Sequence, residues 1–220
     1  MILIIKDVLT ADECDYVAER MASMRFRPGT RTAGWHARLV KDNEQADRMQ
    51  SAYAPLSDMV SQAIMASTEF AQACRPRHMT KLLLSRYRDG MEYGTHVDEP
   101  LIQNLRSDIS FTLFLADPGT YDGGELIMET AGQESSYKLN RGEMIAYDST
   151  RLHRVAPVTR GERLCAVGWA QSRVRDPAQR KILYDLGLVG RAIFDRDGKT
   201  REFDIITKSQ ANLTRMWADG

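Results

Sequence analysis

Two short strands and a turn are predicted in the stretch KLLLSRYRDGMEYGTHVD, residues 81–98. The turn is signalled by Arg88-Asp89-Gly90, and the second strand covers Tyr93–Val97. This strand runs into His96-Val97-Asp98. Successive side chains of a strand point to opposite faces, so His96 and Asp98 share a face that Val97 does not. The stretch therefore predicts an imidazole and a carboxylate directed at one point.

Strand-like segments continue on both sides of this stretch, separated by turns rich in Gly, Asp and Pro. Short strands at such regular spacing are typical of an all-β sandwich or a jelly roll with two sheets. The eight predicted strands are Met79–Tyr87, Tyr93–Val97, Asp108–Leu115, Gly124–Met128, Ser136–Leu139, Glu143–Tyr147, His153–Ala156 and Leu164–Ala170.

Helical patterns flank this β region, which makes the predicted fold class α+β. Thr10 and Glu13 have capping-box spacing and predict a helix that ends near Met24. Residues 1–77 are expected to form an N-terminal support region, 78–172 the jelly roll and 173–220 a C-terminal helical region. The other predicted elements are strands at Ile2–Ile5 and Trp35–Val40, and helices at Ala46–Ser67, from Pro177 to Gly187, and at Thr207–Ala218.

A third metal ligand is predicted at His153, where a later strand begins. Two histidines and one carboxylate bound to one face of a metal leave the opposite face open, as in Fe(II) oxygenases. Taken alone, His96-x-Asp98 is weak, because the chain has 30 acidic residues and a chance pairing is easily found. The interpretation as a metal site therefore needs support from the residues downstream of His153.

Arg163 lies at the start of an apolar alternating strand, and its side chain shares a face with Cys165, Val167 and Trp169. A buried arginine is costly unless it meets an anion, and its planar fork suits a carboxylate. The alternative is that Arg163 ends the strand at the surface beside Glu162. If the shared face looks into the jelly roll, the chain has a metal site and a carboxylate anchor together.

The composition is that of an ordinary globular protein, with 30 basic and 30 acidic side chains. This balance argues against nucleic acid or a membrane surface as a partner. The amino-terminal apolar run ends at Lys6, too early for a signal peptide, so a cytoplasmic location is expected. Three widely spaced cysteines, Cys14, Cys74 and Cys165, fit reduced thiols.

In this order, His96-x-Asp98, His153 and Arg163 resemble the iron(II)/2-oxoglutarate-dependent dioxygenase superfamily, in its prolyl hydroxylase-like branch. Similarity extends to Gly123-Gly124-Glu125-Leu126 and to residues 142–147. The terminal helices and Trp35-His36-Ala37-Arg38 resemble the bacterial PKHD-type hydroxylases, some of which are associated with iron uptake.

The resemblance implies a double-stranded β-helix and a hydroxylase that uses 2-oxoglutarate and O2, hydroxylates a substrate, and releases succinate and CO2. It implies Fe2+ bound by His96, Asp98 and His153, and 2-oxoglutarate bound by Arg163 with Tyr87 and Trp169 nearby. L-ascorbate is implied as a reductant. Where prolyl hydroxylases of the animal type often place a tyrosine near the same carboxylate, this chain has Phe114, which donates no hydrogen bond.

The substrate is left open by the sequence: a peptidyl or free amino acid and a siderophore-related molecule all fit the resemblance. The sequence is compatible with a homo-oligomer but does not determine the oligomeric state. A cupin-like hydrolase or isomerase is the alternative, because the same three ligands also bind Zn, Mn or Ni. A non-catalytic binding module is a third interpretation. Residues 99–107 are a candidate loop over the substrate.

Overall fold

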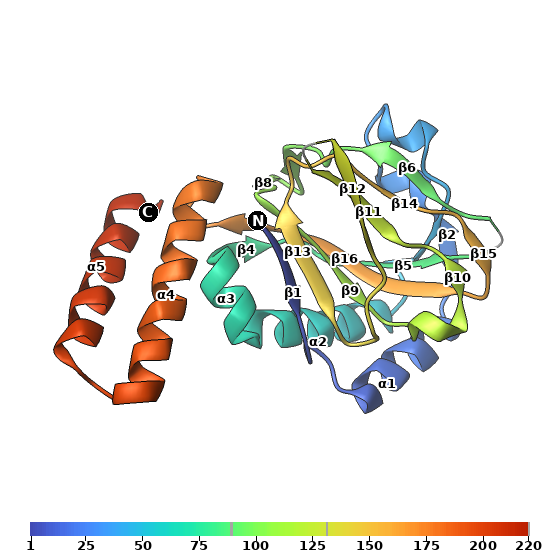
Figure 1. The fold of residues 1–220 in the computed structure, drawn as a ribbon. Helices are drawn as coiled ribbons and strands as arrows, with labels where there is room; N and C mark the ends of the chain where they lie inside the picture. The colour runs from blue at the N-terminus through green and yellow to red at the C-terminus, as the bar shows by residue number, and fades with distance from the viewer. Residues whose placement is uncertain (89, 131, 220) are drawn as a thin grey trace.

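The computed structural model describes residues 1–88, 90–130 and 132–219 (Figure 1). A core of two facing β-sheets is flanked by helices from both ends of the chain, which confirms the predicted α+β jelly roll. The helices are α1 (Ala11–Ala22), α2 (Tyr53–Ala66), α3 (Thr68–Cys74), α4 (Pro177–Asp197) and α5 (Arg201–Trp217). None of the helices in the described ranges is both long and apolar enough to cross a bilayer.

The large sheet is antiparallel and has the strand order β1-β13-β9-β16-β5-β3-β2, with β4 also pairing with β16. Strands β9, β16 and β5 are neighbours in the middle of this sheet and form one side of the site. The strands are β1 (Ile2–Ile5), β13 (Met144–Asp148), β9 (Ile109–Phe114), β16 (Arg163–Ser172), β5 (Leu83–Tyr87), β3 (Glu44–Ala46), β2 (Phe26–Pro28) and β4 (Pro76–Met79).

The small sheet faces the large one and has the order β12-β11-β14-β6. Its strands are β12 (Gln133–Tyr137), β11 (Leu126–Thr130), β14 (His153–Val155) and β6 (Tyr93–His96). Two short ladders complete the described strands: β10 (Asp122–Gly123) with β15 (Val158–Arg160), and β7 (Leu101–Ile102) with β8 (Leu105–Arg106).

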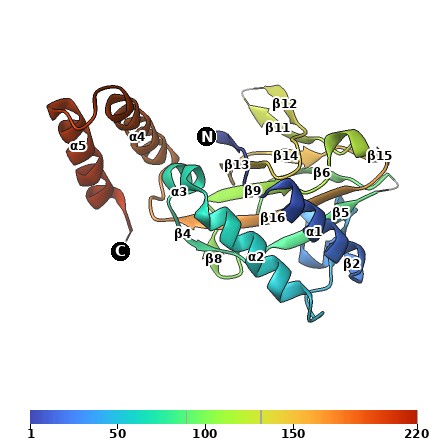
Figure 2. The same cartoon turned by 90° about the horizontal axis from the view of Figure 1, so that it is seen from below.

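Alternation along β9 separates two apolar clusters. Phe111 and Leu113 pack on the outer face of the large sheet against α1, α2 and α3, which lie across that face in Figure 2. Phe114 points the other way and packs between the sheets with Leu126, Val155 and Cys165. The outer cluster fixes the large sheet, and the inner cluster fixes the separation of the two sheets around the site.

The amino-terminal capping box is confirmed. The Thr10 hydroxyl accepts a hydrogen bond from the Glu13 amide at 3.2 Å, and the Glu13 carboxylate accepts one from the Thr10 amide at 2.8 Å. These bonds satisfy two amides that a helix start leaves unpaired. The helix that follows buries Cys14, Val17 and Met21 against the large sheet.

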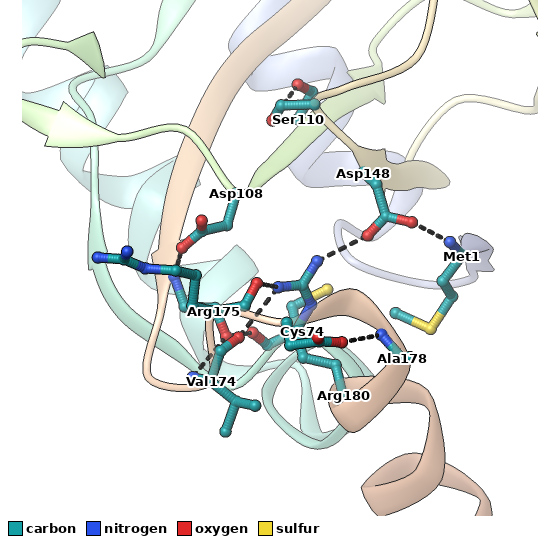
Figure 3. A network of polar contacts seen from close by, with 12 residues as sticks. Met1, Cys74, Asp108, Ser110, Asp148, Val174, Arg175, Ala178 and Arg180 are labelled. Atoms are coloured by element: carbon teal, nitrogen blue, oxygen red, sulfur yellow. Dashed lines mark hydrogen bonds and ion pairs between the residues drawn. The ribbon is translucent and has the colours of Figure 1, made fainter. Parts of the chain in front are cut away.

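The carboxyl-terminal helices form a hairpin that stands beside the core and contacts α3 (Figure 1). Arg180 of α4 is 2% exposed and donates to Asp148 Oδ1 at 2.7 Å and to the carbonyls of Val174 and Arg175 (Figure 3). The amino group of Met1 also forms an ion pair with Asp148. This network attaches the hairpin to the end of β13.

The predicted helix end at Gly187 is wrong, because α4 continues to Asp197. A Cβ atom at Gly187 would lie 2.8 Å from Nε2 of Gln210 in α5. Gly187 is therefore a point of close helix–helix approach inside the hairpin. The last helix also begins earlier than predicted, at Arg201, where the Thr200 hydroxyl caps it.

Three further elements differ from prediction. Trp35–Val40 is not a strand but contains a 3-10 turn at Ala37–Leu39, and its apolar Trp35 and Leu39 are 76% and 77% exposed. The predicted helix Ala46–Ser67 starts only at Tyr53, because the Asp47 side chain accepts the Met49 amide in a turn. The single strand predicted at 79–87 is two strands, β4 and β5, because the hydroxyl of Thr80 accepts the Trp169 amide between them.

Candidate active site

Strands β6 and β14 bring three potential metal ligands together. His153 lies directly opposite His96 in the antiparallel register, and Asp98 follows two residues after His96. One ligand atom from each residue lies within 4.8 Å of the others, and His153 Nε2 is 3.8 Å from Asp98 Oδ2. The sequence predicted that His96 and Asp98 share a face, and the structure brings His153 to the same point.

Backbone carbonyls fix the orientation of both imidazoles. His96 Nδ1 lies 2.8 Å from the Gly94 carbonyl, and His153 Nδ1 lies 3.0 Å from the Arg151 carbonyl. An Nδ1–H that donates to a carbonyl leaves Nε2 as the ring's free lone pair. Burial, together with the neighbouring His153, lowers the pKa of His96 to about 4. His96 is therefore neutral at pH 7, as a metal ligand must be.

A serine pair orients the carboxylate ligand. The Ser110 hydroxyl donates to Asp98 Oδ2 at 2.6 Å and lies 2.8 Å from the hydroxyl of Ser149. Ser149 can therefore donate to Ser110 while Ser110 donates to Asp98. Both serines are buried. The bond fixes the orientation in which the carboxylate faces the two imidazoles.

A cavity of about 390 Å³ opens onto these three residues. Its volume lies within the range usual for small-molecule sites. The large sheet contributes Leu83, Ser85, Tyr87, Thr112, Tyr147, Val167 and Trp169 to the lining, and residues 101–103 form part of the mouth. A further wall comes from residues 32–48.

Arg163 is 1% exposed and points between the two sheets. Its guanidinium carbon lies 5.1 Å from the ring centres of both Tyr87 and Phe114, and Nη1 lies 3.0 Å from Cys165 Sγ. Its Nε has no hydrogen-bond partner. The surface alternative fails, because Glu162 pairs with Arg86 instead. No ion pair of Arg163 with a carboxylate occurs among the described residues, so this buried cation lacks the counter-charge that burial usually requires.

Gly124 makes space for the Arg163 side chain. A Cβ atom there would lie 2.9 Å from Arg163 Cδ and 3.1 Å from Tyr121 Cε2, and the backbone φ is +70°. Tyr121 is buried and its hydroxyl has no hydrogen-bond partner. Arg163 and Tyr121 therefore converge on one glycine, each with unused hydrogen-bonding capacity.

Tyr87 and Trp169, the other residues expected beside the co-substrate, line the cavity, whereas Arg163 is not among its lining residues. Tyr87 is directly opposite Arg163 in the β5–β16 register, and Trp169 lies farther along β16 with its Nε1 unpartnered. Tyr93 stacks on His96 with ring centres 3.6 Å apart, and Tyr147 packs edge-on to His153. Burial raises the pKa of Tyr87, Tyr93 and Tyr147, so their hydroxyls remain protonated donors.

Sequence reasoning missed several of these residues. Ser110 and Tyr121 sit among ordinary strand and turn residues, and nothing nearby marks them. Lys41, Asn43 and Gln45 occur in the polar stretch 41–45, which has the composition of a surface loop. The one available signal was their alternate spacing, which is typical of a strand with one distinct face.

Comparison with known proteins agrees with this geometry. Residues 82–171 match the family model described as the 2OG-Fe(II) oxygenase superfamily. PKHD-type hydroxylases of Acaryochloris marina and Maricaulis maris are 48% and 45% identical, each over 219 residues that cover 100% of both chains. A Pseudomonas putida prolyl-4-hydroxylase structure has a TM-score of 0.56 at 22% identity, covering 78% of this chain and 92% of that one.

A viral collagen prolyl hydroxylase from Paramecium bursaria Chlorella virus-1, solved with 2OG, has a TM-score of 0.54 at 20% identity. It covers 78% of this chain and 96% of that one. The fold and the His-Asp-His cluster thus define a 2OG-Fe(II) dioxygenase. Within that superfamily, the full-length relatives show that the chain belongs to the PKHD-type hydroxylases.

Proposed function

We propose that His96, Asp98 and His153 bind Fe(II), and that the enzyme hydroxylates a small-molecule or peptide substrate with 2-oxoglutarate as co-substrate. The observation that carries the proposal is the convergence of two imidazoles and an oriented carboxylate in the wall of a cavity. Nitrogen and oxygen ligands of this kind on one face suit Fe(II) and leave coordination positions for other molecules.

We propose that Arg163 binds the distal carboxylate of 2-oxoglutarate, with the hydroxyl of Tyr121 as second donor. Both are buried and have unused donors, and both converge on Gly124. Phe114, at the position where a family tyrosine was expected, packs against Arg163 and offers no donor. Tyr121 would take the role that Phe114 cannot.

O2 would be the oxidant, bound iron would activate it, and 2-oxoglutarate would be the electron donor: one oxygen atom would enter succinate, the other would enter the substrate hydroxyl, and CO2 would be released. The chain's own residues would bind the iron and the co-substrate, orient them, and shield them from water. Ser110 holds Asp98 in one rotamer, and the two backbone carbonyls hold the imidazoles. Tyr87 and Trp169 would position the co-substrate from the large sheet. Leu126, Val155 and Val167 exclude water from the inner end of the cavity.

In this proposal, residues 78–172 form the domain that carries the active site, and residues 1–77 and 173–220 pack around that domain and stabilise it. L-ascorbate as the reductant that restores Fe(II) rests on family likeness alone. The cytoplasm is proposed because Cys14, Cys74 and Cys165 are buried free thiols. Measuring succinate release with and without ascorbate tests the reductant.

The test of the proposed function uses metal-loaded protein under anaerobic conditions. Adding 2-oxoglutarate to the Fe(II) protein should produce a weak visible charge-transfer band. Arg163→Met should lower the affinity for 2-oxoglutarate by about 100-fold, since a charge-assisted pair is lost. Failure of the wild-type protein to bind 2-oxoglutarate would leave the cupin-like alternative as the better interpretation.

A further inference from the structure

Three polar side chains form one wall of the cavity. Lys41, Asn43 and Gln45, here called the inner polar row, alternate along an extended segment, are buried, and line the cavity. Between them Asp42 is exposed and Glu44 forms an ion pair with Arg86. Burying polar groups costs free energy unless something binds them. The row is therefore unusual for a wall that serves packing alone.

The row is held firmly beside the strand that carries His96. The Asp42 amide donates to the Glu92 carbonyl at 2.8 Å, and the Gly94 amide donates to the Val40 carbonyl at 2.8 Å. The backbones of Lys41 and Tyr93 therefore lie opposite each other in an antiparallel β-bridge. A Cβ atom at Gly94 would lie 2.8 Å from Cβ of Val40, so the glycine permits this close approach. The ammonium group of Lys41 is fixed in place next to the candidate metal site.

The Lys41 ammonium lacks a full set of partners. It is 8% exposed as a residue, lies 4.8 Å from the centre of the Tyr93 ring, and donates to the Thr32 hydroxyl at a long 3.4 Å. Within the described part of the chain it forms no ion pair with a carboxylate. Asn43 is 4% exposed, and its Oδ1 packs against Gly29, where a Cβ atom would lie only 1.7 Å from it. The Lys41 ammonium is therefore the donor in this wall with unused capacity.

The charged side chains that line the cavity leave Lys41 without a carboxylate of its own. The lining carboxylates are Asp98, a candidate metal ligand, and Glu99, whose Oε1 lies 3.6 Å from His36 Nε2. Arg48 also lines the cavity and donates to the Leu82 carbonyl. A ligand carboxylate would therefore supply the partner that the Lys41 ammonium lacks.

We propose that Lys41 binds a carboxylate of the primary substrate. The inference rests on the proposed function and narrows its substrate to acidic molecules: a free amino acid, a carboxyl-terminal residue or an acidic side chain. The other source of the same chemistry is a carboxylate of 2-oxoglutarate itself, and measuring 2-oxoglutarate affinity separates the two.

The test uses Fe(II) protein saturated with 2-oxoglutarate in the absence of oxygen. Calorimetric titration employs N-acetyl amino acids, each as the free carboxylate and as the carboxamide of nearly equal shape. In the wild type, at least one carboxylate should bind about tenfold more tightly than its amide. Lys41→Met should reduce that preference to about threefold or less, and Lys41→Arg should keep part of it. Lys181→Met, which removes an exposed lysine from α4, should leave it intact.

Equal preference in the wild type and in Lys41→Met would overturn the proposal, as would the absence of any carboxylate preference in the wild type. A tenfold or larger loss of 2-oxoglutarate affinity in Lys41→Met would also overturn it and place Lys41 in the co-substrate site. If the wild type developed no visible band with 2-oxoglutarate, the proposed function itself would fail. These outcomes are distinct, because the band is recorded before any probe is added.

Discussion

The hydroxyl of Ser110 donates to Oδ2 of Asp98 at 2.6 Å, and this bond joins the large sheet to the three candidate metal ligands beside the small sheet. Ser110 lies on β9, whereas Asp98 follows β6. A carboxylate ligand that is hydrogen-bonded through one oxygen presents the other in a fixed direction. The two sheets thus meet at the candidate metal site through this hydrogen bond and through the edge-on packing of Tyr147 against His153.

Ser110→Ala should weaken iron binding by about tenfold, since outer partners of metal ligands typically contribute at least that much. The fold should be retained, because alanine fits the same strand position. Iron affinity can be measured by competition with a chelator under anaerobic conditions. Ser136→Ala, at an exposed position of β12, is the matched control and should bind iron as the wild type does. Equal affinity in both variants would show that the Ser110 bond does not orient the ligand.

Gly124→Ala should impair 2-oxoglutarate binding through Arg163. The new Cβ would lie 2.9 Å from Arg163 Cδ and would force the guanidinium or Tyr121 to move. Gly132→Ala controls for backbone strain, because Gly132 has a similar φ of +77° but no atom within 4 Å of its Cβ position. Both variants should lose about 1 kcal/mol of stability from the left-handed backbone. Only Gly124→Ala should raise the dissociation constant for 2-oxoglutarate.

Arg163 and Arg180 are equally buried but should respond differently to replacement by methionine. Arg180 is paired with Asp148, so Arg180→Met should lower the free energy of unfolding by about 3 kcal/mol. Arg163 has no carboxylate partner in the described chain, so Arg163→Met should not destabilise the metal-free protein. Urea unfolding measures stability, and anaerobic titration measures 2-oxoglutarate affinity. Comparable destabilisation by both variants would contradict the ligand role of Arg163.

Lys41→Met should stabilise the metal-free protein at neutral pH. Burial lowers the pKa of Lys41 to about 8, from 10.5, with Asp98 and Cys165 acting in the opposite direction. Tyr93 and His96 are the other titratable groups that it faces. The folded ammonium is therefore less favourable than the unfolded one below about pH 8, and the wild type should gain stability as pH rises from 8 to 10.5.

The advantage of Lys41→Met should be about 2–3 kcal/mol at pH 7 and should shrink toward pH 10.5. Thermal or urea unfolding at the two pH values measures it, with Lys181→Met as the exposed control. A variant that is less stable than the wild type at pH 7 would show that Lys41 contributes to folding, rather than being retained at a cost to stability.

The period of two along strands explains why so much of the site could be predicted. His96 and Asp98 share a face on any regular strand, and so do Arg163 and Trp169, whatever the rest of the chain does. The capping box at Thr10 is equally local. These predictions needed only neighbours in sequence, and the structure places the residues accordingly.

The rest depended on contacts between distant segments. Gly187 looked like a helix end because nothing in the sequence says that Gln210 will approach it. Trp35–Val40 looked like a strand because its apolar residues suggested burial, yet Trp35 and Leu39 face solvent. Lys41 and Asn43 look like surface residues until pairing with β6 turns them inward. Local pattern cannot supply this information, because tertiary context decides which face is covered.

The strand pairing of the jelly roll also sets when the enzyme can acquire iron. Ile2 pairs with Tyr147, His96 with His153, and Tyr87 with Arg163, so no part of the site is complete while the chain is still short. Ribosomes add about 5–20 residues per second, and pairings of such long range form slowly. Nascent chains therefore expose His96 and Asp98 without their third partner, and the set of three candidate ligands is complete only once β14 has paired with β6.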